Sequence, residues 1–246
     1  MLNTYNFTTN LFFTELFFTL FYVFLKTAEH HKHLKMGRTN MKTKSNWTTC
    51  NKHNIIIEAY AYNILMAGKY TITTLNVKGL RQSNKRKCIF QYLKTKQTDI
   101  CLLQEVHIDI DDDQLWEQEW NQGCFCANVG TRASAGTLIL TKLKMTVIKN
   151  IIHEPGRLQE VLLQHNDTTL RIFNIYGYNK EQLRIPLLQK LEKALAIVQH
   201  CDFLLIGGDF NIVLSNEMDK RGGQNRKTGS QIHINRMMSD HNLVDT

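Results

Sequence analysis

Beyond Lys69, short apolar runs alternate with polar turns along the chain. The runs are rich in β-branched and aromatic residues, which pack well on the pleated surface of a sheet. Each run is short enough to form one strand. The pattern predicts β-strands over residues 70–77, 99–106, 136–143, 145–152, 158–165, 169–176 and 202–209.

Two segments between these runs have helical periodicity instead. In the first, Ser83 is placed to cap a basic helix. The apolar positions on one face of that helix are Ile89, Phe90 and Leu93. In the second, apolar side chains recur with a 3.6-residue period, at Leu188, Leu191, Leu195 and Val198. Pro186 fits the first turn of this second helix, where its missing N–H costs no intrahelical bond.

The order of the predicted elements indicates the fold class. Consecutive strands between residues 136 and 176 are typical of antiparallel hairpins, whereas a helix between two strands makes a crossover. A chain with both arrangements folds as α/β sheets with helices on their outer faces. The 246 residues are enough for one such domain, and no internal repeat is visible.

Residues 1–68 do not share this pattern, and we predict an extension that lies outside a domain of residues 69–246. Residues 11–25 are apolar, but a helix that spans a bilayer takes about 20 such residues, and Glu15 lies inside this stretch. A membrane anchor is therefore a disfavoured alternative. Residues 26–68 are polar and carry much of the net charge of +8, so the predicted domain is only mildly basic.

The six cysteines indicate neither a zinc site nor a disulfide framework. No Cys-x-x-Cys pair is present, and Cys124 and Cys126 have no second pair to complete a metal site. Cys101 lies inside an apolar run and is interpreted as a core residue. This usage is typical of a reducing compartment.

Three predicted strands end on a polar residue after an apolar run. These residues are Asn76, Glu105 and Asp209, and Asn211 follows two residues after the last. Ligands gather at the carboxyl ends of strands in open α/β sheets. All four side chains offer hard oxygen donors, which suit Mg²⁺ held by one or two carboxylates together with a substrate phosphate. Tyr176 ends another strand and adds a phenol donor.

Taken singly, most of these residues have a structural explanation. An Asn after a strand is usually a turn residue, and an isolated Gly-Asp-Phe-Asn is commonly a loop. Tyr176 alone would be an ordinary half-buried aromatic residue. Glu105 is more informative, because an acid at the end of a buried run needs a partner. The combination of these residues, in their order along the chain, is more informative than any one of them.

The order of the motifs makes the combination recognisable. L-N-x-x-G-L stands at 75–80, D-I-C-L-L-Q-E at 99–105, P-G-R at 155–157, N-I-Y-G-Y-N at 174–179 and L-L-I-G-G-D-F-N at 204–211. This series resembles the exonuclease–endonuclease–phosphatase superfamily. Within it, the series is most similar to the endonuclease domain of LINE-type (non-LTR) retrotransposons, relatives of the apurinic/apyrimidinic endonucleases. The resemblance covers residues 69–246.

The resemblance implies a four-layer α/β sandwich of two mixed β-sheets flanked by helices, and a DNA endonuclease that nicks one strand. It implies that Glu105 and Asn76 hold Mg²⁺, for which Mn²⁺ could substitute, with no small-molecule cofactor. Asp209 would orient or deprotonate the attacking water, Asn211 would hold the scissile phosphate, and Tyr176 would donate a hydrogen bond to the phosphate oxygens. Asp209 and Asn211 also belong to the implied metal site. With DNA as the substrate, the nucleus is the expected location.

The chain departs from the family pattern in two places. The family reads Tyr-x-Pro-Asn where this chain has Tyr178 in place of the proline. Ser239-Asp240-His241 matches the family's final catalytic motif, but the apolar spacing around it predicts a helix and not a strand end. We therefore expect this triplet to be a decoy, the sandwich to be incomplete at its C-terminal end, and the nuclease to be inactive if the missing motif is essential.

Candidate DNA contacts lie outside the metal site. Loop 220–227 is basic and rich in glycine, so Arg221, Arg226 and Lys227 could bind DNA phosphates, with an ordinary solvated loop as the equal alternative. Asn179, in the motif that follows Tyr176, is a further candidate. The acidic run from Asp109 to Asp113 predicts a solvated loop that does not attract DNA.

Two other functions fit the same motifs. Gln-Glu and Gly-Asp-Phe-Asn are shared across the superfamily, so they do not separate a retrotransposon endonuclease from a repair endonuclease or a phosphatase. The basic helix from Lys85 to Lys96 and the L-N-x-x-G-L motif favour DNA. A non-enzymatic remnant that binds metal or nucleic acid weakly is the remaining alternative.

Overall fold

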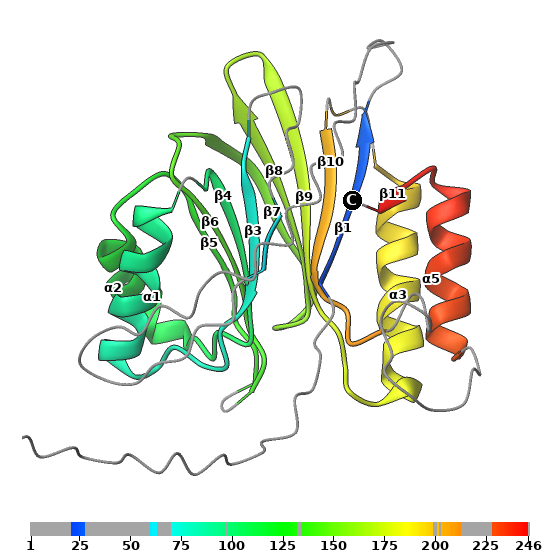
Figure 1. Cartoon of the computed structure of the whole chain (residues 1–246), viewed down its shortest axis with the longest axis horizontal. Coiled ribbons are helices and arrows are strands. Elements are labelled where there is room, and N and C mark those ends of the chain that lie inside the picture. Colours follow the sequence, from blue (N-terminus) through cyan, green and yellow to red (C-terminus); the bar gives the residue numbers. More distant parts are fainter. Residues whose placement is uncertain are drawn as a thin grey trace, which may run out of the picture.

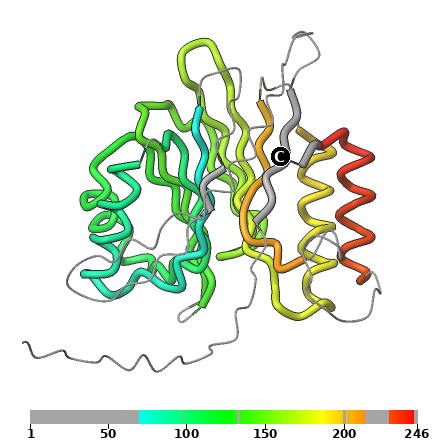
Figure 2. The backbone as a smooth tube through the Cα atoms, in the orientation of Figure 1, coloured from blue at the N-terminus to red at the C-terminus, as the bar shows by residue number. Residues whose placement is uncertain are grey.

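The computed structural model describes residues 21–27, 60–62, 70–96, 98–131, 134–198, 201, 203–212 and 228–245 (Figures 1 and 2). The six-stranded sheet has the order β11-β1-β10-β9-β8-β7, formed by Val244–Asp245, Phe21–Thr27, Phe203–Asp209, Thr168–Tyr176, Leu158–His165 and Thr146–Glu154. The five-stranded sheet has the order β2-β3-β4-β6-β5, formed by Tyr60–Tyr62, Ile72–Asn76, Ile100–Gln104, Thr137–Thr141 and Phe125–Asn128.

Helices cover the outer face of each sheet (Figure 1). α1 (Ser83–Thr95) and α2 (Asp113–Trp120) cover the five-stranded sheet, and α3 (Glu181–Ala196) and α5 (Gly229–Asp240) cover the six-stranded sheet. Buried apolar side chains fill the space under each helix pair and the space between the sheets. The four-layer α/β sandwich predicted from the sequence is confirmed.

Two crossovers bring strand ends together. β3 runs parallel to β4 with α1 between them, and β9 runs parallel to β10 with α3 between them. Parallel neighbours end at the same edge of their sheet. The antiparallel order β7-β8-β9 confirms the hairpins predicted between residues 145 and 176.

The hairpin expected between residues 136–143 and 145–152 does not form. β6 belongs to the five-stranded sheet and β7 to the six-stranded sheet, so the short connection between them crosses from one layer to the other. An apolar run predicts a strand, but it does not say which sheet that strand joins. β7 is an edge strand with large apolar side chains exposed, at Val147, Ile148, Ile151 and Ile152.

Both predicted helix starts need correction. Ser83 is the first residue of α1, and Gln82 occupies the cap position without a side-chain cap hydrogen bond. Pro186 lies inside α3, which begins earlier, at Glu181. The Glu181 carboxylate fixes that start by accepting hydrogen bonds from the Ser230 N–H at 2.6 Å and the Ser230 hydroxyl at 2.8 Å. The tertiary anchor and the buried apolar face of α3 outweigh the hydrogen bond that proline removes.

The acidic run from Asp109 to Asp113 is also more ordered than predicted. Asp109 caps a single 3-10 turn (η1, Ile110–Asp112) by accepting a hydrogen bond from the Ile110 N–H, and Asp113 begins α2. Trp116 and Trp120 are the two buried residues of this eight-residue helix. Two buried positions one turn apart are too few for a periodic signal, so α2 was not predicted from the sequence.

Two pieces of the predicted N-terminal extension belong to the sheets. β1 pairs antiparallel with β10, and β2 pairs antiparallel with β3. An added strand satisfies the N–H and C=O groups that a sheet edge leaves unpaired. The boundary at residue 69 is therefore wrong for these two segments, and the rest of residues 1–68 lies outside the described residues. No helix in the described part of the chain is long and apolar enough to cross a membrane.

Candidate active site

The predicted strand-end residues of both sheets meet in one place. Asn76 ends β3 of the five-stranded sheet, and its Nδ2 donates to Asp209 Oδ2 at 2.9 Å, at the end of β10 in the six-stranded sheet. Tyr176 ends β9 and donates its hydroxyl proton to Glu105 Oε2 at 3.0 Å. Each hydrogen bond joins one sheet to the other, so the two sets of strand ends form a single site.

The backbone at Glu105 turns the carboxylate into this site. Glu105 follows β4 with a φ of 57°, a left-handed conformation that non-glycine residues rarely adopt. Such strain is typical of functional positions and costs of order 1 kcal/mol. Gly79 supports the turn, because its N–H donates to the Glu105 carbonyl at 2.6 Å. A Cβ on Gly79 would lie 2.9 Å from His107 Nδ1, which explains the glycine of L-N-x-x-G-L.

His107 is a neighbour of Glu105 that the sequence analysis missed. Its Nε2 lies 3.8 Å from Glu105 Oε1, and its own φ of 56° is again left-handed. The His107 N–H donates to the Ala135 carbonyl at 2.9 Å, which ties this turn to the loop that precedes β6. No motif in the sequence marks His107, because its place depends on two consecutive irregular turns.

Asp209 is the buried carboxylate of the site, with 1% of the residue exposed. Its Oδ1 accepts from the Asn211 N–H at 3.1 Å, while Oδ2 accepts from Asn76. Burial raises the pKa of Asp209 to about 6, and these two hydrogen bonds oppose only part of that rise. A carboxylate with this pKa takes up a proton near neutral pH far more readily than an exposed Asp does.

Tyr176 is held as a neutral phenol. Burial, and then the negative charge of Glu105, raise the pKa of Tyr176 to about 12. The guanidinium of Arg157 packs on the ring, with its Cζ 4.2 Å from the Tyr176 ring centroid and 4.4 Å from that of Tyr178. The P-G-R and N-I-Y-G-Y-N motifs are therefore one structural unit.

Asn211 lies beside Asp209 because of a close backbone contact. The Gly177 N–H donates to the Asp209 carbonyl at 2.6 Å, and Asn211 Nδ2 donates back to the Gly177 carbonyl at 2.9 Å. A Cβ on Gly177 would lie 2.1 Å from the Phe210 carbonyl oxygen, so only glycine fits there. The N-I-Y-G-Y-N and G-G-D-F-N motifs thus meet backbone to backbone.

A buried amide pair joins the two sheets beneath the site. Gln104 Nε2 donates to Asn174 Oδ1 at 2.8 Å, and both residues are fully buried. Asn174 Nδ2 in turn donates to the carbonyls of Leu103 at 3.0 Å and Leu138 at 3.2 Å. Gln104 directly precedes Glu105, and Asn174 lies two residues before Tyr176, so the pair fixes the relative position of the strands that carry them.

The donor set fits a hard divalent cation. Glu105 and Asp209 supply carboxylate oxygens, Asn76 supplies an amide oxygen, and the Glu105 side chain is 26% exposed. Within the described ranges, no group of three or more His, Cys, Asp or Glu side chains could hold a metal ion by itself. In proteins, Mg²⁺ is usually held by one or two carboxylates together with water and a substrate phosphate.

The remaining candidate residues lie elsewhere. Asn179 is exposed in the connection between β9 and α3. Arg221, Arg226 and Lys227 fall outside the described residues.

The predicted helix around Ser239-Asp240-His241 is confirmed, since the triplet ends α5. The first turn of α5 contacts Glu181, which lies shortly after the end of β9. Each further residue of the helix lies about 1.5 Å farther along its axis. The triplet therefore lies roughly 15 Å farther along the helix, away from the strand ends.

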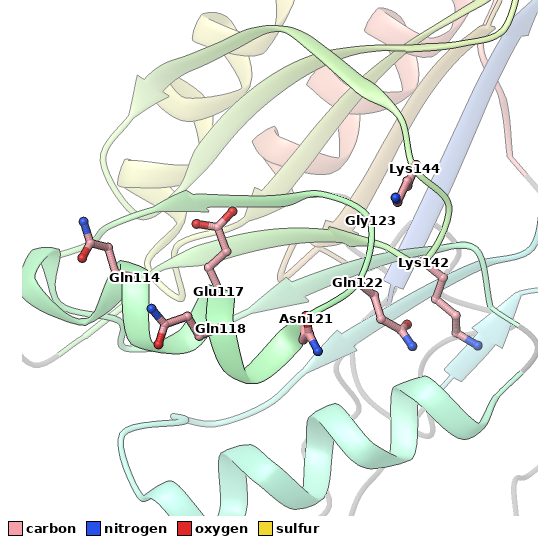
Figure 3. Close-up of a pocket in the computed structure, with 8 residues that line it drawn as sticks. All are labelled: Gln114, Glu117, Gln118, Asn121, Gln122, Gly123, Lys142 and Lys144. Atoms are coloured by element: carbon pink, nitrogen blue, oxygen red, sulfur yellow. The ribbon is translucent and has the colours of Figure 1, made fainter.

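A separate polar pocket opens at the other end of the five-stranded sheet (Figure 3). It is lined by Gln114, Glu117, Gln118, Asn121, Gln122, Gly123, Lys142 and Lys144. β6 leads into this pocket, and its last residue, Thr141, pairs with Ile100 at the start of β4. Glu105 follows the opposite end of β4, so the pocket and the candidate active site are distinct.

Comparison with known proteins settles the family. The model of the endonuclease/exonuclease/phosphatase family matches residues 62–237. The chain belongs to this family. The superfamily resemblance predicted from the motifs is thus confirmed. The chain is also similar to the transposon TX1 uncharacterized 149 kDa protein of Xenopus laevis, with 24% identity over 177 residues. The match covers 71% of the chain but only 13% of the TX1 protein.

Solved structures show the same fold. The AP endonuclease LMAP from Leishmania major has a TM-score of 0.54 at 15% identity, with 70% of this chain and 67% of that chain covered. The endonuclease domain of TRAS1, a telomere-specific non-LTR retrotransposon, has a TM-score of 0.51 at 11% identity, with 70% and 72% covered. An AP endonuclease from Archaeoglobus fulgidus has a TM-score of 0.54 at 16% identity, with 68% and 69% covered.

Proposed function

We propose that this chain is a metal-dependent DNA endonuclease domain of retrotransposon type, which nicks one strand. The observation that carries the proposal is the convergence of Asn76, Glu105, Tyr176 and Asp209 on one point through two hydrogen bonds between the sheets. Membership of the endonuclease/exonuclease/phosphatase family supports hydrolysis of a phosphate ester. The similarity to a transposon protein and to a retrotransposon endonuclease domain supports the narrower assignment.

Each residue has a role that follows from its environment. Glu105 and Asn76 would hold a divalent cation, Mg²⁺ or Mn²⁺, with Asp209 and Asn211 next to it. Such a cation, when bound, neutralises phosphate charge and stabilises the leaving oxygen. Asp209 accepts the proton of the attacking water, because its burial makes it a better base than an exposed Asp.

Two further groups would act on the phosphate itself. Tyr176 keeps its proton at neutral pH, so it can donate a hydrogen bond to a phosphate oxygen. Asn211 would donate its side-chain amide to the same group once it releases the Gly177 carbonyl.

The surroundings of the site favour a polyanionic substrate. Lys85 lies beside the site, where its Nζ donates to the Lys78 carbonyl at 2.9 Å. Burial lowers the pKa of Lys85, whereas the nearby negative charge of Glu105 raises it. Arg221, Arg226, Lys227 and Asn179 are the proposed additional DNA contacts. With DNA as the proposed substrate, we propose that the protein acts in the nucleus.

The test is nicking of supercoiled plasmid by the full 246-residue chain with Mg²⁺. We expect nicking that falls at least 100-fold in Glu105→Gln, because one metal-binding carboxylate is lost. Glu117→Gln makes the same chemical change at an exposed position of α2 and should leave the rate unchanged. His241→Ala should also leave the rate unchanged, since the triplet lies away from the strand ends.

The outcomes separate the alternatives. A well-folded chain that does not nick DNA under any of these conditions contradicts the proposal and favours the non-enzymatic remnant. Loss of nicking in His241→Ala would show that the decoy interpretation is wrong. A plasmid that carries abasic sites, cut far faster than intact plasmid, would identify a repair endonuclease instead.

A further inference from the structure

Arg157 is a motif residue to which the proposed mechanism gives no role. Its guanidinium packs against the rings of both Tyr176 and Tyr178, with Cζ to centroid distances of 4.2 and 4.4 Å. Arg157 Nη1 also donates to the carbonyls of Tyr176 at 3.4 Å and Gly177 at 3.2 Å. Two cation–π contacts and two hydrogen bonds fix this charge in place before any substrate arrives.

The turn that carries Arg157 is built for close packing. Gly156 has a φ of 66°, and a Cβ there would lie 2.6 Å from the Cα of Gly130. The Arg157 carbonyl accepts from the Tyr176 N–H at 2.8 Å, which locks the turn to the end of β9. The P-G-R motif therefore delivers a rigid cation to the edge of the active site.

This cation differs from the other arginines that the structure describes. Arg81, Arg86, Arg171, Arg184 and Arg236 each lie within 4.0 Å of a carboxylate oxygen. Arg157 alone among the described arginines has no such ion pair. The Arg157 side chain is half-buried, and its Nε and Nη2 atoms donate to no described residue. Neither atom is a buried donor that lacks a partner. Solvent therefore reaches these donors.

We infer that Arg157 is a preformed binding site for a DNA phosphate that flanks the phosphate to be cut. The inference rests on the proposed function for its choice of DNA as the ligand. A guanidinium presents its N–H groups as a planar fork that matches two phosphate oxygens. A cation that is held rigidly against two aromatic rings, with no ion pair to a described carboxylate, loses little entropy when it binds an anion.

The experiment measures DNA binding without catalysis. Full-length protein in EDTA is titrated onto a fluorescent duplex of about 20 base pairs, and fluorescence anisotropy is recorded at several salt concentrations. Each protein–phosphate ion pair contributes about 0.9 to the slope of log K against log salt. We expect Arg157→Gln to weaken binding about tenfold at low salt, and to reduce that slope by about one contact.

Two further variants serve as controls. Arg157→Lys keeps the charge but not the fork, so it should keep the slope and lose only a few-fold in affinity. Lys144→Gln removes the same charge at the polar pocket, at the far end of the sheet, and should bind like wild type (Figure 3). Near-ultraviolet circular dichroism establishes whether each variant is folded. If Arg157→Gln is not folded, Arg157→Lys is compared with wild type in its place.

The results distinguish this inference from the proposed function. Wild-type affinity and slope in Arg157→Gln would overturn the inference. Slower nicking of plasmid with Mg²⁺ by that variant, at an unchanged slope, would then show that Arg157 only positions Tyr176. DNA binding that depends on Arg157 in a chain that never nicks DNA would support the inference and contradict the proposed enzyme. A wild-type chain that does not bind DNA contradicts both.

Discussion

Replacing Asp209 with Asn should remove activity and change how stability depends on pH. The pKa of Asp209 rises from its ordinary 3.8 to about 6 on folding. The folded chain therefore holds this proton more tightly than the unfolded chain does. Protonated Asp209 favours the fold, and this advantage is complete below about pH 3.8 and is lost as the pH rises through about 6.

The magnitude follows from the same values. At about 1.4 kcal/mol per pH unit, the difference between 3.8 and 6 corresponds to about 3 kcal/mol lost at pH 8. At pH 5, one unit below the folded pKa, about 1.4 kcal/mol of the advantage remains. Asp209→Asn does not ionise and has no such loss. The NH₂ of the new amide faces another hydrogen-bond donor, either Asn76 Nδ2 or the Asn211 N–H. This mismatch lowers the free energy of unfolding by about 1–3 kcal/mol at every pH, which is the fixed cost of the amide.

The assay compares urea unfolding of the two proteins at pH 5 and pH 8 in EDTA. The fluorescence of Trp116 and Trp120, both fully buried, reports the transition. The free energy of unfolding of Asp209→Asn relative to wild type should rise by about 1.4 kcal/mol between pH 5 and pH 8. The fixed cost of the amide cancels in this comparison. An equal difference at both pH values would refute the reasoning.

Three further substitutions test the surroundings of the site. Asn174→Leu removes the buried hydrogen bond from Gln104 Nε2 and the two that Asn174 donates to the Leu103 and Leu138 carbonyls, and it should lower the free energy of urea unfolding by about 3 kcal/mol; an unchanged midpoint would contradict this. Tyr176→Phe should slow nicking about 100-fold by removing one donor, and wild-type activity should show no loss from tyrosine ionisation up to pH 10, since the pKa is about 12. Gly177→Ala places a methyl group 2.1 Å from the Phe210 carbonyl oxygen and should cost about 2 kcal/mol or more; a wild-type Tm would argue against the close contact.

The parts of this protein that the sequence predicted are those set by local pattern. Apolar runs predicted the central strands of both sheets, and the end of each run pointed to Asn76, Glu105, Tyr176 and Asp209. The short α2 helix was missed because its two buried tryptophans give no periodic signal. The chain also changes sheets between β6 and β7, and nothing in the Lys142–Met145 connection marks that change.

The neighbours of the predicted residues could not be found in this way. Arg157 stacks on Tyr176 from a turn 19 positions earlier in the chain, and Gln104 meets Asn174 across a separation of 70. The Gln104–Asn174 contact depends on how the two sheets stack, and the Arg157–Tyr176 contact depends on how β8 pairs with β9 inside one sheet. No sequence window contains either arrangement. His107 depends on irregular backbone turns, which do not follow a period either.

The cross-sheet hydrogen bonds have a mechanical consequence. Asn76 with Asp209, and Glu105 with Tyr176, each take one member from each sheet. If one sheet slid over the other by even an ångström, both pairs would lose their geometry together, and neither layer could keep half of the site. The alignment of the proposed catalytic groups thus depends on the stacking of the whole sandwich, and loss of activity should reveal slippage between the layers before either layer unfolds.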